Sequence, residues 1–174
     1  MPDPGLLDVL RRSGGMSAVA RQLVIPPTTA LAAATALLPF LRGGLRRRVE
    51  LADNLGTGLD ELLTLLEELG GGALASRVLQ QDQADVQVGE SVLRAILGPD
   101  SVSQLVIKDA AARSELEPAV VGQILPLLAI LAAGYVSARA GRMSPAERLA
   151  ELGPLLDLDG EPNPLDGLIG IPDE

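Results

Sequence analysis

The chain has 174 residues, enough for one domain with its own hydrophobic core. It contains no cysteine and no histidine, which excludes disulfides, thiolate sites and imidazole groups acting as metal ligands or general bases. The net charge of −9 is unevenly placed: residues 1–50 carry +4 and residues 51–174 carry −13. This asymmetry indicates either pairing between the basic and acidic parts or a polar partner for one of them, with solvated surface charge as the alternative.

The core must be aliphatic, because Phe40 and Tyr135 are the only aromatic residues. Alanine and leucine have high helix propensity, so the composition favours an all-α fold. The chain starts without the basic and apolar segments of a secretory signal, and we expect a cytoplasmic protein.

The first half predicts short helices at Leu6–Leu10 and Ser17–Leu23, then a long apolar helix from Thr28 to Leu41. We expect Gly43-Gly44 to weaken the helix after that point, before Leu45–Ala52. An interior proline, Pro39, costs about 3 kcal/mol and is expected to bend the long helix.

The second half predicts further helices and a second long apolar helix, Pro118–Ala140, which contains Pro126 as a second bend. The shorter segments read as helices with glycine or proline stops between them. They lie around residues 59–69, at Ala73–Leu79, at Gly89–Leu97, from Asp100 or Ser101 to Arg113, and after Ser144.

From Gly153 the helical pattern ends. Residues 153–174 hold four prolines, four glycines and no basic residue, which predicts an irregular acidic tail after a helical domain of residues 1–152. The tail has the oxygen-ligand spacing of a calcium loop, but proline and leucine replace its required glycine and glutamate. Its leucines also suit a docking peptide, and its charge suits contact with the Arg42–Arg48 region. The residues concerned are Asp157, Asp159, Glu161, Pro162, Asn163, Asp166 and Leu168 for the loop, and Leu155, Leu156, Leu158, Leu165, Leu168 and Ile169 for docking.

Two uncharged runs, Gln22–Leu41 and Pro118–Ala138, approach membrane-spanning length. Both end in positive charge, whereas two consecutive spans would run in opposite directions. Buried core helices are therefore favoured over spans.

The two proline motifs suggest an internal repeat. Ala34–Leu41 aligns with Val121–Leu128, and Ala20–Pro27 aligns with Ala111–Pro118. Each unit reads as a short helix, a turn and a long bent helix, with a chance match between Ala/Leu-rich segments as the alternative.

The glycine and aliphatic pattern of Gly89–Gly98, followed by Ser114-Glu115-Leu116 and Ile124–Ala129, resembles the bacterial domain of unknown function 937, which is related to the YidB-like proteins. Ala18–Gly44 is similar to the amino-terminal part of that family, and the resemblance covers residues 5–140. The family often has glycine where this chain has Val24 and Glu115. The resemblance implies an all-helical fold and carries over no catalytic residue.

Three further features allow a functional interpretation. Residues 17–42 resemble a helix-turn-helix, but the second helix is mostly alanine and leucine and lacks side chains that read bases. The basic cluster Arg42, Arg46, Arg47 and Arg48 suits the end of a helix, or an anion, lipid or tail-docking patch. No spacing of a nucleophile and a base, and no phosphate-binding loop, occurs in the sequence.

We therefore expect a compact bundle of about eight helices with no catalytic residue, no cofactor and no metal. A non-enzymatic scaffold or interaction protein, with a protein partner or a second copy, is the favoured function. Nucleic-acid binding through residues 17–42 and association with a membrane surface are the alternatives.

Overall fold

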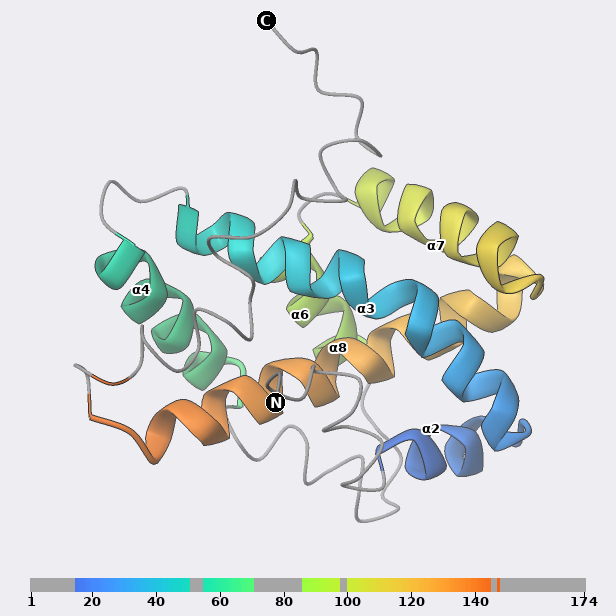
Figure 1. Cartoon of the computed structure of the whole chain (residues 1–174), viewed down its shortest axis with the longest axis horizontal. Helices are drawn as coiled ribbons and strands as arrows, with labels where there is room; N and C mark the ends of the chain where they lie inside the picture. The colour runs from blue at the N-terminus through green and yellow to red at the C-terminus, as the bar shows by residue number, and fades with distance from the viewer. Residues whose placement is uncertain (1–14, 51–54, 71–85, 98–99, 145–146, 148–174) are drawn as a thin grey trace, which may run out of the picture.

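The computed structural model describes residues 15–50, 55–70, 86–97, 100–144 and 147 (Figure 1). Within these ranges the chain forms six helices and no strand, which confirms the predicted all-α class. The helices are α2 (Gly15–Leu23), α3 (Pro27–Glu50), α4 (Leu55–Glu68), α6 (Val86–Ile96), α7 (Asp100–Ser114) and α8 (Pro118–Gly141). About eight helices were expected, and the described residues form six. The predicted helices at Leu6–Leu10 and Ala73–Leu79, like the segment from Gly153, lie outside the described residues.

The two long helices cross at the centre of the fold (Figure 1). Helix α8 contacts each of the other five described helices, and fourteen of its residues are buried. Its apolar residues are spread around most of its circumference, which suits a helix that packs against five others. The largest fully buried side chains come mainly from α3, α4 and α8: Leu37, Leu41, Leu45, Leu59, Leu66, Ile124, Leu125, Leu128 and Leu131.

Both long helices are long and apolar enough to cross a membrane by length and composition alone. In the folded chain, however, 56% of the Pro27–Arg47 window and 67% of the Pro118–Gly141 window are buried. Core helices of a soluble protein meet the same criteria, and this burial supports that interpretation.

The predicted end of the long helix at about Leu41 is wrong, because α3 continues through Gly43-Gly44 to Glu50. The reason lies in a neighbouring helix. A Cβ atom on Gly44 would lie 2.4 Å from Ile96 Cγ2 and 2.7 Å from the Ile96 carbonyl oxygen. Glycine at this position lets α3 approach the end of α6, and the packing gained outweighs the roughly 1 kcal/mol of lost helix propensity.

Two sharp corners join α2 to α3 and α7 to α8 (Figure 1). In each corner a non-glycine residue has positive φ, 56° at Val24 and 59° at Glu115. The amide after each donates to the carbonyl five residues earlier: Ile25 to Ala20 at 3.0 Å, and Leu116 to Ala111 at 3.1 Å.

The long helices that follow these corners also begin alike. Pro27 and Pro118 are their first residues, and each helix has 24 residues. Proline fits this position because the first helical N–H has no intrahelical acceptor. The two units thus match at a constant offset of 91 residues. Val24 corresponds to Glu115, and the first and last residues of α3 correspond to those of α8.

Candidate functional site

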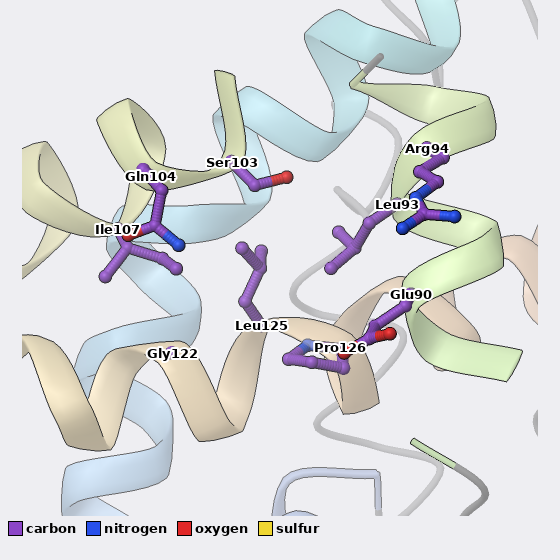
Figure 2. A pocket seen from close by; sticks show the side chains of 9 residues that line it. All are labelled: Glu90, Leu93, Arg94, Ser103, Gln104, Ile107, Gly122, Leu125 and Pro126. Atoms are coloured by element: carbon purple, nitrogen blue, oxygen red, sulfur yellow. The ribbon is translucent and has the colours of Figure 1, made fainter. Parts of the chain in front are cut away.

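A cavity of about 230 Å³ lies between α6, α7 and α8 (Figure 2). It is smaller than the roughly 300–1,000 Å³ of pockets that hold drug-sized ligands. A cavity of roughly 150 Å³ already accepts a benzene-sized group. The volume therefore suits one aliphatic side chain together with the adjoining peptide group.

The lining combines an apolar floor with a polar rim. Leu93 of α6 and Leu125 of α8 point into the middle of the cavity, and Figure 2 shows Gln104 reaching from α7 toward α8. The two leucines are buried, whereas Gln104 and the charged rim residues are exposed. The full lining is Glu90, Leu93, Arg94, Ser103, Gln104, Ile107, Gly122, Leu125 and Pro126.

Glu90 and Arg94 lie one helical turn apart on α6 and give this wall both signs of charge. Ser103 and Gln104 supply a hydroxyl and an amide on the opposite side. Such a rim can bind both the N–H and the C=O of a ligand's amide, while the leucines cover its apolar part.

The proline at position 126 also changes the α8 wall. Proline has no N–H, so the Gly122 carbonyl lacks the donor that residue i+4 normally supplies in a helix. Both Gly122 and Pro126 line the cavity. The wall therefore contains a residue without a side chain, whose carbonyl lacks its usual helical donor.

Gly89 sets the lower boundary between α6 and α8. A Cβ atom there would lie 2.7 Å from the Pro126 Cβ and 3.2 Å from the Pro126 carbonyl oxygen. The two helices touch at this point, and the cavity begins at Glu90, the next residue of α6, and extends to Leu93, one turn further along. The close contact at Gly89 thus fixes the position of Pro126 relative to the α6 side chains.

The structure places the sequence-predicted residues in different regions. Pro126 lines the cavity, while Pro39 is half-buried in the interior of α3. The predicted anion or tail-docking patch, Arg42, Arg46, Arg47 and Arg48, lies in the C-terminal half of α3 and outside the cavity lining. The side chains of the first three are half-buried.

The described ranges hold no group of three or more aspartate, glutamate, histidine or cysteine side chains that could bind a metal ion. The predicted calcium loop around Asp157 lies outside those ranges.

Apart from Pro126, the cavity residues were not among the predicted site residues. Gln104 and Ser103 are ordinary polar residues on a helix, and nothing in the sequence distinguishes them. The available signal was the combination of Gly122 and Pro126, four residues apart in a predicted helix, because that pair removes a side chain and a donor from one face.

The fold and cavity define a small aliphatic helical domain with a peptide-sized site. Among known families, the one described as bacterial protein of unknown function (DUF937) matches residues 10–139. The match covers well over half of the sequence, and the chain belongs to this family. No curated protein and no solved structure matches it.

Proposed function

We propose that the protein is a non-enzymatic interaction domain that binds a short aliphatic peptide segment of a protein partner in the α6–α7–α8 cavity. The observation that carries this proposal is the apolar lining by Leu93 and Leu125 beside Gly122, whose carbonyl loses its usual helical donor at Pro126. A leucine-like side chain would fill the floor, and its backbone N–H would donate to that carbonyl. The lack of histidine and cysteine supports a role without catalysis.

The two alternative functions have weaker support. Helix α3 would be the recognition helix of a nucleic-acid binder, but Ala30, Ala33 and Ala34 in its first half are buried. Membrane association would need an exposed apolar face. In the described part of the chain, Val24 and Leu105 are the only large apolar side chains that are exposed.

We also infer that α2–α3 and α7–α8 descend from one duplicated unit. The constant 91-residue offset, the equivalent corner hydrogen bonds and the equal helix lengths support this inference. The interior prolines differ in position by one turn, which is compatible with independent change after a duplication.

The binding proposal is tested with N-acetyl-leucine N-methylamide, a probe that has one aliphatic side chain and two N–H groups. At about 0.3 kcal/mol per heavy atom, its thirteen heavy atoms give about 4 kcal/mol, or a Kd of about 1 mM. Titration followed by amide NMR shifts should show changes clustered on Glu90–Arg94, Ser103–Ile107 and Gly122.

Gly122→Ala is the informative variant. Its methyl group would meet Ile107 Cδ1 at 3.6 Å, an ordinary contact, so the fold should tolerate it. The methyl would nevertheless stand beside the acceptor, and we expect at least a fivefold loss of probe affinity. Gly141→Ala, which adds a methyl group in open space at the end of α8, is the matched control. Equal affinity in the two variants, or shifts scattered over the surface, would refute the proposal.

A further inference from the structure

All the charge in the cavity lining comes from one helix. Glu90 and Arg94 of α6 are exposed at the rim, and the other lining residues are uncharged. On α7, Lys108 follows one turn after Gln104 but is not part of the lining. Helix α8 carries no charged side chain from Pro118 to Ala138. The two side chains of α6 therefore set the electrostatic preference of the site.

These two charges follow one another along the α6 wall. Gly89 is in close contact with Pro126, so Glu90 lies at the end of the wall that meets α8, and Figure 2 shows it beside Pro126. Arg94 lies one helical turn later, about 6 Å further along the α6 axis at 1.5 Å per residue. A ligand that lies along α6 therefore meets a negative charge near α8 and a positive charge further away.

The spacing of the two charges matches that of an extended peptide. The residues on either side of a central residue are about 7 Å apart, at about 3.3–3.6 Å per residue. Their side chains point to the face opposite the central side chain. If a leucine-like side chain fills the floor between Leu93 and Leu125, its two neighbours are directed toward the exposed rim, where Glu90 and Arg94 lie.

We propose that the cavity selects an aliphatic residue flanked by one basic and one acidic residue, with the basic residue against Glu90 and the acidic residue against Arg94. The inference rests on the proposed function, since it names the class of peptide that the same site takes. The Gly122 carbonyl lies on one wall only, so the two directions in which a peptide can run along α6 are not equivalent. One order of the two charges therefore fits the site better than the other.

Two probes of identical composition test the proposal, N-acetyl-Lys-Leu-Glu N-methylamide and N-acetyl-Glu-Leu-Lys N-methylamide. Both have no net charge, so their general attraction to a chain of net charge −9 is the same. Their affinities for the full-length chain are measured by titration, followed by the amide NMR shifts of the lining residues.

An exposed ion pair changes an affinity by about 1.4- to 5-fold, and the two probes differ at both charged contacts. We therefore expect one order to bind at least about threefold more tightly at about 10 mM ionic strength. In about 1 M salt the Debye length is about 3 Å, and the preference should largely disappear.

Reversing the charges of the wall should reverse the preference. Glu90→Lys combined with Arg94→Glu does this without changing the net charge of the chain, and the probe that bound more weakly should then bind more tightly. Arg21→Glu combined with Glu61→Lys is the matched control, because it exchanges one charge of each sign at exposed positions on α2 and α4, outside the lining. The control should keep the original preference. The single variants Glu90→Gln and Arg94→Gln should each reduce it.

Equal affinity of the two probes for the unmodified chain at low salt would overturn the proposal. So would a preference that survives the exchange on α6, or one that reverses in the control. If N-acetyl-leucine N-methylamide still binds in these cases and still responds to Gly122→Ala, the charge selection is wrong and the peptide site stands. If neither the charged probes nor the leucine probe shift the lining residues, the site itself is wrong.

Discussion

Replacing Gly44 by alanine should destabilise the protein, although alanine is the better helix former. The added Cβ would lie 2.4 Å from Ile96 Cγ2, 2.7 Å from the Ile96 carbonyl oxygen and 3.1 Å from its carbonyl carbon. A new rotamer of Ile96 would remove the first contact. It would leave the two backbone contacts, so α3 and α6 must move apart.

Overpacking of this kind costs about 1–3 kcal/mol, and the helix propensity of alanine returns about 1 kcal/mol. We therefore expect Gly44→Ala to lower the free energy of unfolding by about 0–2 kcal/mol. In Gly122→Ala the nearest contact of the added methyl group is an ordinary 3.6 Å. The higher helix propensity of alanine should therefore raise the free energy of unfolding by up to about 1 kcal/mol. The two variants should differ by about 1–3 kcal/mol, or about 2–12 °C in Tm for a chain of this size.

Urea unfolding followed by circular dichroism at 222 nm measures this difference directly, because the signal is helical and the chain has no tryptophan. Equal m-values would show that the variants unfold to comparable states. The reasoning about close helix approach would be refuted if Gly44→Ala were as stable as Gly122→Ala.

Gly89→Ala should also destabilise the fold, by about 1–3 kcal/mol before any propensity gain, because its Cβ would meet the rigid Pro126 ring at 2.7 Å; an unchanged urea midpoint would contradict this. Val24→Gly should raise the free energy of unfolding by up to about 1 kcal/mol, since a left-handed residue with a Cβ costs about 1–2 kcal/mol and glycine loses about 0.5–1 kcal/mol of entropy; a lower urea midpoint would count against strain at this corner. Pro126→Ala supplies an N–H to the Gly122 carbonyl, so the amide at position 126 should be protected from hydrogen exchange while probe affinity falls about tenfold. If the amide at position 126 were protected but the probe affinity were unchanged, the Gly122 carbonyl would have no role in binding the probe.

The sequence was sufficient where a local rule decides the outcome. Pro118 begins its helix as predicted, and α3 begins at Pro27, one residue before the predicted Thr28, because proline's fixed φ and missing N–H suit the first helical position. The wholly apolar character of the second long run indicated a buried helix, and α8 is the most enclosed helix of the described fold.

Where the outcome depends on a distant residue, sequence reasoning failed. Nothing near Gly44 reveals that Ile96 packs against it, so the glycine was expected to weaken the helix, whereas it allows a close helix contact. The cavity depends on how α6 and α7 lie against α8, and only Pro126 among its lining residues stood out in advance. Val24 shows a third case: no glycine marks the position in this sequence, and the chain has positive φ there nevertheless.

The central position of α8 has a consequence for synthesis on the ribosome. Helices α2, α3 and α4 each contact α8, which begins only at Pro118. Between residue 50, where α3 ends, and residue 141, where α8 ends, translation at about 5–20 residues per second takes about 5–18 s. During that interval the aliphatic faces of the first helices lack the partner that buries them in the native state. The nascent chain therefore exposes a leucine-rich surface suited to chaperones until its last long helix emerges.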